Sequence, residues 1–145
     1  MERHDRLGVQ IALGWITCLL VLLAQLTHTM LTGMLTEASK FFVSLHYDPG
    51  QSGLKMLAFI VPYYALMPVY VSVVSGRRSR LFRWLAVGFA SLSLVFNLLH
   101  HLSHWYGGQR PDFSSHVMDL TLHIVGSWVL FNSIRWAKLP PTAEP

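Results

Sequence analysis

Long apolar runs alternate with short polar connections along this chain. Four of the runs reach the roughly 20 residues that a helix needs to cross a bilayer: residues 8–32, 54–75, 81–104 and 113–134. The pattern predicts an all-α integral membrane protein, folded as a four-transmembrane-helix bundle. Residues 1–138 are expected to form this single membrane domain, and residues 139–145, which include three prolines, are expected to form a disordered tail.

The positions of the basic residues predict the orientation of the bundle. Eight of the 11 lysines and arginines lie before the first run, between the second run and the start of the third, or after the fourth: Arg3, Arg6, Arg77, Arg78, Arg80, Arg83, Arg135 and Lys138. Basic residues collect on the cytoplasmic side of membrane proteins, so both termini are expected in the cytoplasm. We expect the membrane to be a bacterial inner (cytoplasmic) membrane.

Composition agrees with this class of protein. The chain is 52% hydrophobic and 12% charged, and a soluble domain would carry about twice that charge. The lipid bilayer is therefore the expected partner. For so small a chain, a homo-oligomer and a larger membrane complex are the two further kinds of partner to consider. The net charge of +4 comes from residues that flank the spans, so nucleic acid is not expected as a partner. The single cysteine, Cys18, excludes an intrachain disulfide and a Cys-based metal centre.

Histidines gather on the outer side of the predicted bundle. Seven of the eight fall in the outer connections or the outer halves of the spans, and Asp119 is the one acidic residue inside a span. At about 1.5 Å per residue, the polar groups of the first, third and fourth spans lie about 4 to 15 Å below the outer surface. On the fourth span, His116, Asp119 and His123 fall within about 80° of the helix circumference. These groups are expected to face one another inside the bundle.

The spacing of these residues favours a metal site. His100 with His104, and Asp119 with His123, are pairs four residues apart, which places two ligands on one face of a helix. Imidazole and carboxylate together suit copper, zinc or iron. The predicted ligands are His100, His104, Asp119, His123, His28 and His116. Gln25, Asn97 and His101 are expected to support the ligands by hydrogen bonding.

Two short stretches resemble metal sites of known membrane enzymes. His100-His101-x2-His104 resembles a reversed fragment of the histidine boxes of membrane di-iron hydroxylases and desaturases. Asp119-x3-His123 is similar to part of the Asp/His copper site in the membrane subunits of copper-dependent monooxygenases. Each resemblance covers only a few residues and implies oxidoreductase chemistry at a bound metal.

Four functions remain open from the sequence. The first is a small membrane metalloprotein, acting as a metal-dependent enzyme or as the metal-binding subunit of a membrane complex. The second is a b-type cytochrome, with haem b between facing histidines such as His28 and His101, or His100 and His123, passing electrons between quinol and an outer partner. The third is a pH-responsive carrier or channel. The fourth is a structural or assembly subunit whose polar groups join helices.

Overall fold

The fold is entirely helical in the part of the chain that the computed structural model describes, residues 3–35, 53–75, 79–106 and 113–140. Its four helices are α1 (Arg3–Leu35), α3 (Gly53–Ser75), α4 (Arg80–Tyr106) and α5 (Phe113–Ala137). Each predicted apolar run is therefore a helix, and most of the helix ends lie a few residues beyond the predicted ones. The predicted tail beyond residue 140 lies outside the described residues.

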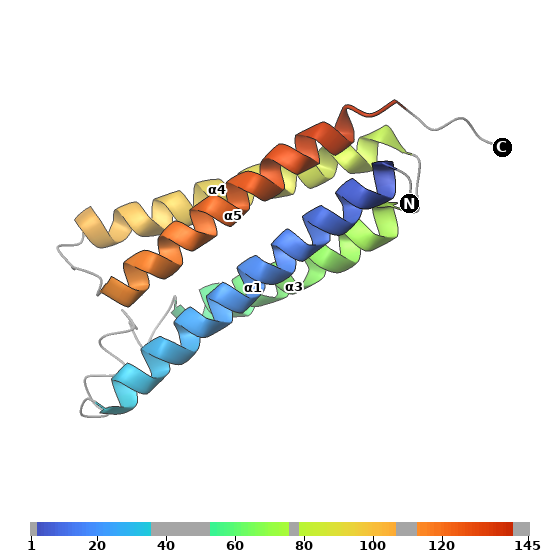
Figure 1. The fold of residues 1–145 in the computed structure, drawn as a ribbon. Coiled ribbons are helices and arrows are strands. Elements are labelled where there is room, and N and C mark those ends of the chain that lie inside the picture. The colour runs from blue at the N-terminus through green and yellow to red at the C-terminus, as the bar shows by residue number, and fades with distance from the viewer. Residues whose placement is uncertain (1–2, 36–52, 76–78, 107–112, 141–145) are drawn as a thin grey trace.

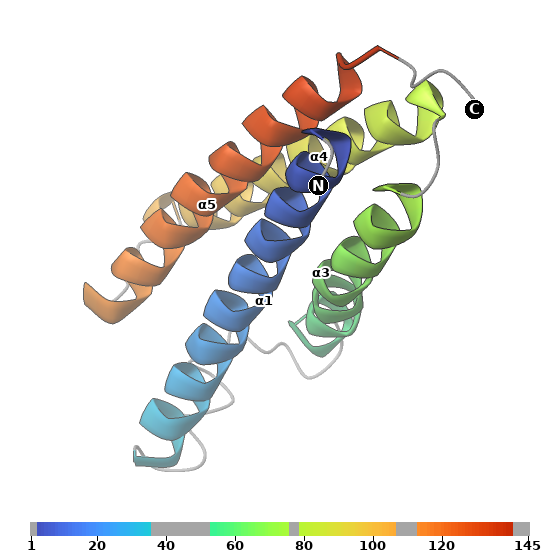
Figure 2. The same cartoon turned by 45° about the vertical axis from the view of Figure 1, so that its right-hand side comes forward.

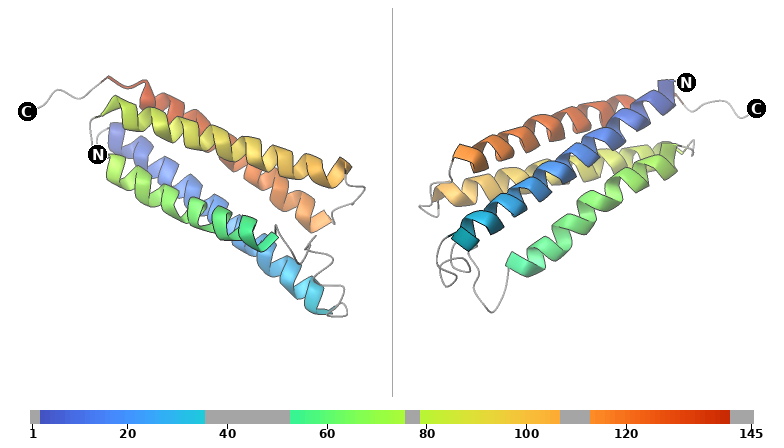
Figure 3. Two further views of the ribbon diagram at one scale, coloured as in Figure 1. Left: turned by 180° about the vertical axis from the view of Figure 1, so that it is seen from behind. Right: turned by 60° about the horizontal axis from the view of Figure 1, so that its bottom comes forward.

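The helices lie along a common direction, with α1 between α3 and α5 (Figures 1 and 2). The backbone of α1 packs closely on both α3 and α5, and α4 packs closely on α5, whereas α3 and α4 barely approach. α1 and α5 lie closest near the end where α1 begins and separate toward the other end (Figure 3). Helices α4 and α5 are thus antiparallel neighbours, as the short connection between them predicts.

The outer surface of the helices is more apolar than a protein in water tolerates. Large apolar side chains such as Phe113 and Leu81 are 83% and 67% exposed, whereas polar Ser93, Asp119 and Ser133 are buried. Three helical stretches are long and apolar enough to cross a membrane: Arg3–His28, Arg80–Leu102 and His116–Ala137. In α3 the described apolar stretch, Pro62–Val74, is shorter. These properties indicate a lipid environment.

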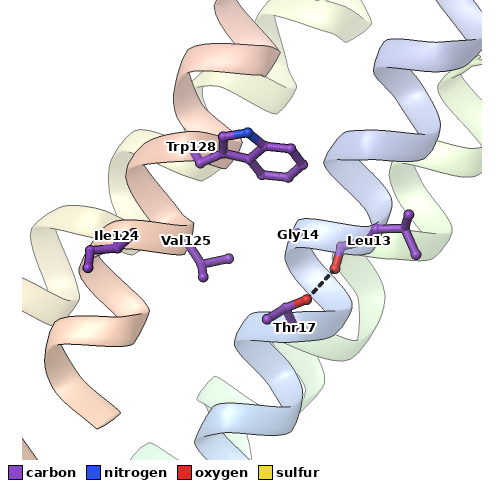
Figure 4. Close-up of a pocket in the computed structure, with 6 residues that line it drawn as sticks. All are labelled: Leu13, Gly14, Thr17, Ile124, Val125 and Trp128. Carbon is purple, nitrogen blue, oxygen red and sulfur yellow. Dashed lines mark hydrogen bonds between the residues drawn. The ribbon is translucent and has the colours of Figure 1, made fainter. Parts of the chain in front are cut away.

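The contact between α1 and α5 depends on a glycine. A Cβ atom on Gly14 would lie 2.3 Å from Cγ2 of Val129, so the two helices can approach this closely only without a side chain there. Beside this contact runs an apolar groove lined by Leu13, Gly14, Thr17, Ile124, Val125 and Trp128 (Figure 4). The Thr17 hydroxyl donates to the Leu13 carbonyl of its own helix at 2.9 Å, so the groove offers mainly apolar surface.

Tyrosine side chains span the wider gap between α3 and α4. The Tyr64 hydroxyl lies 2.5 Å from Oγ of Ser93 and accepts a hydrogen bond from Nδ2 of Asn97 at 3.0 Å. Tyr63 and Tyr70 donate to backbone carbonyls of α4. Interhelical hydrogen bonds of this kind hold helices together where the apolar solvent gives no hydrophobic driving force.

Replacing Tyr64 by phenylalanine is expected to lower the free energy of unfolding by about 1 kcal/mol, because Ser93 and Asn97 lose a buried partner. Tyr70→Phe is the matched control. Its hydroxyl donates to the Phe82 carbonyl, which the helix itself can satisfy, so the loss should be smaller. Thermal unfolding of both variants in detergent measures the difference, and equal losses would contradict a special role for the Tyr64 contacts.

Candidate functional site

Asp119 joins three helices at one point. Its carboxylate is buried on α5, with the residue only 5% exposed. Nε2 of Gln25 on α1 donates to Oδ1 at 3.2 Å, and Nδ1 of His101 on α4 lies 3.1 Å from Oδ2. A carboxylate among apolar helices is unfavourable unless donors or a positive charge compensate it. Gln25 and His101 supply that compensation from the two helices that flank α5.

His123 lies one helical turn further along α5 and has a defined tautomer. Its Nδ1 lies 2.7 Å from the backbone carbonyl oxygen of Asp119, and because a carbonyl oxygen only accepts, Nδ1 carries the proton and donates it. In the neutral ring, Nε2 then presents a lone pair. This Nε2 atom is buried and has no hydrogen-bond partner within the described ranges. A buried polar atom without a partner is uncommon, so the Nε2 lone pair is a candidate ligand atom.

Two further imidazole contacts surround His101. Its ring centroid lies 5.8 Å from that of His116 and 6.0 Å from that of His123, with interplanar angles of 67° and 71°. His101 of α4 is therefore the central member of three histidines, and the other two lie on α5. Because its Nδ1 faces the Asp119 carboxylate, the orientation of the His101 ring is set by that contact.

The structure brings together five of the predicted residues, Gln25, His101, His116, Asp119 and His123. We define these five as the Asp119 cluster. The other predicted residues lie near it or outside the description. His28 lies on α1, one turn beyond Gln25, and His100 lies on α4, next to His101. Both side chains are partly buried. Asn97 donates to Tyr64 on α3, and the side chain of His104 lies outside the described residues.

His101 was expected to support the ligands by hydrogen bonding, or to bind haem together with His28, but the sequence did not reveal that it is the histidine that contacts Asp119. It makes the contact with Asp119 and two ring contacts, and it follows Asn97 by one helical turn. Within the described part of the chain, no three His, Cys, Asp or Glu side chains are placed so that they could hold a metal ion as they stand. Metal binding in the Asp119 cluster would therefore require its rings to turn.

Buried Arg83 is a second feature that the sequence did not reveal. It was interpreted as part of the basic connection between the second and third spans, but its side chain is only 1% exposed. The small residues Ala86, Ala90 and Ser93 follow it at intervals of three or four along α4 and are also buried. This spacing is the signal that could have placed Arg83 on the inward face.

Comparison with protein-family models finds no match for this chain, and neither curated proteins nor solved structures match it.

Proposed function

We propose that the chain is a small membrane metalloprotein that binds a transition metal at the Asp119 cluster. In this proposal all four helices cross the membrane, and both termini lie in the cytoplasm. Supporting the orientation, Arg3, Arg6, Arg80, Arg83, Arg135 and Lys138 all lie near the end of the bundle where α1 begins and α5 ends. The Asp119 cluster then lies near the opposite, outer face.

The observation that carries the proposal is the buried Nε2 atom of His123, which has no partner among the described residues. The Nδ1 contact with the Asp119 carbonyl fixes the tautomer in which Nε2 can bind a metal. Histidines that bind metals typically donate their other ring nitrogen to a carbonyl or a carboxylate. Here Nδ1 of His123 contacts the backbone carbonyl of Asp119, and Nδ1 of His101 contacts its carboxylate.

Ring spacing also agrees with a shared metal. A metal–nitrogen bond is about 2.0–2.1 Å long, so the metal lies about 3.2 Å from the ring centroid. Two imidazoles on opposite sides of one metal would then have centroids about 6.4 Å apart, and a tetrahedral pair about 5.2 Å apart. The centroid distances of 5.8 and 6.0 Å from His101 to His116 and His123 fall between these limits. Rotation of the rings, with limited helix movement, would bring three nitrogens to one metal.

Three imidazoles would leave a four-coordinate metal one open position for water or substrate. Such a metal supplies Lewis acidity or activates the bound water. Asp119 would hold His101 in place and balance part of the metal charge, while Gln25 would hold the carboxylate. This arrangement fits a metal-dependent enzyme or a metal-binding subunit of a larger complex. A haem fits less well, because α4 and α5 pack closely and a macrocycle would have to separate them.

The test is metal analysis of the full chain purified in detergent without chelator, with an absorption spectrum of the same sample. We expect about one copper, zinc or iron per chain and no Soret band. His123→Ala should lower the metal content at least about tenfold, whereas His4→Ala, at the other end of α1, should not. Metal-free protein, or unchanged content in His123→Ala, would refute the metal site. A Soret band would assign the cluster to haem b instead.

A further inference from the structure

Arg83 is buried at the end of the bundle opposite the Asp119 cluster. It stands in the first turn of α4 and is 1% exposed. Its Nη1 donates to the carbonyls of Trp136 and Leu139, at 3.0 and 3.2 Å, and lies 3.2 Å from Nδ1 of His4. The guanidinium therefore contacts residues at the start of α1 and at the end of α5. Figure 1 shows the start of α1, the start of α4 and the end of α5 together at one end of the bundle.

These partners do not neutralise the charge. Two are carbonyl oxygens, and the third is an imidazole nitrogen that accepts a hydrogen bond only when it is unprotonated. The end of α5 contributes the partial negative charge of a helix C-terminus. Among the described acidic residues, Asp5 is exposed and forms no ion pair with Arg83, and Asp119 pairs with His101. A buried guanidinium without an anion is strongly unfavourable.

The unpartnered atoms of Arg83 form one edge of the guanidinium. Nε and Nη2 are both buried and have no hydrogen-bond partner within the described residues. Their N–H groups point in parallel and match two oxygens of a phosphate or carboxylate. The first turn of α4 adds backbone N–H groups that no residue of its own helix can accept. The Nε and Nη2 groups of Arg83 and the backbone N–H groups of this turn are thus the kinds of donor that bind an oxyanion.

The surroundings favour a phosphate that carries acyl chains. Arg80, exposed in the same turn of α4, adds a second positive charge. On the outward sides of the same turns of α4, the apolar side chains of Leu81, Trp84 and Leu85 are 67%, 41% and 44% exposed, and they offer a surface for lipid chains. Basic pockets between helix ends on the cytoplasmic side are typical sites for anionic headgroups.

We propose that the Nε–Nη2 edge of Arg83 binds the phosphate of an anionic phospholipid on the cytoplasmic side of the bundle. Both nitrogens are buried, so the side chains that cover them must shift before the headgroup enters. Bound lipid should therefore exchange slowly and tie α4 to the ends of α1 and α5. The cytoplasmic side follows from the orientation proposed above, whereas the site does not depend on the metal, because it lies at the other end of the helices.

The test measures thermal unfolding of the detergent-purified full chain with added dioleoyl phosphatidylglycerol, dioleoyl phosphatidylcholine or inorganic phosphate. We expect phosphatidylglycerol, near saturation, to raise the unfolding temperature by roughly 5 °C, and the other two to have little effect. Arg83→Gln should abolish the shift, and Arg80→Gln, which removes an exposed arginine from the same turn, should keep most of it.

A full shift in Arg83→Gln would overturn the proposal, as would equal shifts with phosphatidylglycerol and phosphatidylcholine. An equal shift with inorganic phosphate would replace the lipid by a free ion. If Arg83→Gln does not fold, Arg83→Lys provides the second variant. It keeps the charge but loses the parallel N–H edge, so it should lose at least half of the shift. The comparison of phosphatidylglycerol with phosphatidylcholine on the unsubstituted chain tests the proposal even if neither variant folds.

Discussion

Asp119→Ala is expected to lower the bound metal at least about tenfold, because one carboxylate holds two elements of the proposed site. Oδ2 contacts His101, and Oδ1 accepts from Gln25. Without the carboxylate, the His101 ring loses its fixed orientation, and the metal loses a nearby negative charge. His123 keeps its contact, because Nδ1 donates to the backbone of residue 119. The measurement is metal content per chain by mass spectrometry.

Thr121→Ala is the matched control for this prediction. Thr121 lies on α5 two residues from Asp119, and its hydroxyl donates to the Val117 carbonyl of its own helix at 2.8 Å. The variant should therefore keep its metal. If Asp119→Ala retains full occupancy, the carboxylate has no role in metal binding, and its contacts serve only to join α1, α4 and α5. If both variants lose metal equally, the loss reflects general damage to α5.

Gly14→Ala is expected to lower the free energy of unfolding by about 1–3 kcal/mol, the usual effect of overpacking a close contact. The added methyl group would lie 2.3 Å from Val129 Cγ2 and 2.9 Å from a ring carbon of Trp128. Valine is stiff about χ1, and the indole ring is rigid, so the helices must separate to relieve the contact. Thermal or denaturant unfolding in detergent measures the loss.

Gly88→Ala supplies the comparison, because it is the same substitution in the middle of a helix without the contact. A Cβ on Gly88 meets no atom within 4 Å. Alanine there should leave the stability unchanged or raise it by up to about 1 kcal/mol, since it favours the helical backbone. Similar effects at both positions would show that the α1–α5 contact tolerates a methyl group.

The helices could be predicted because hydrophobicity and length alone select them. Each apolar run became a helix, and the short polar connection between the last two runs predicted that α4 and α5 are neighbours. The position of α3 could not be predicted. Its described stretch is apolar around most of its circumference, so no polar stripe marks the side that faces α1. The structure places it on α1, joined to α4 through tyrosines.

The residues of the cluster were predictable as a group, but their individual roles were not. Polar groups at similar depth on three helices pointed to one place, and the structure brings Gln25, His101 and Asp119 into contact there. His100 and His101 follow Asn97 by three and four residues, and both spacings fit one helical face. Which of the two meets Asp119 depends on the rotation of α4 against α5. That rotation is set by packing along the whole contact, which no local pattern encodes.

The contact between Gln25 and Asp119 has a consequence for biosynthesis. Gln25 lies in α1 and Asp119 in α5, so Gln25 leaves the ribosome well before Asp119. During synthesis, the Gln25 side chain therefore has no contact with Asp119 until α5 has been made and packs against α1. The contacts of Asp119 with Gln25 and His101 therefore form only after α5 has been made, and a chain truncated before α5 would leave both side chains without this carboxylate.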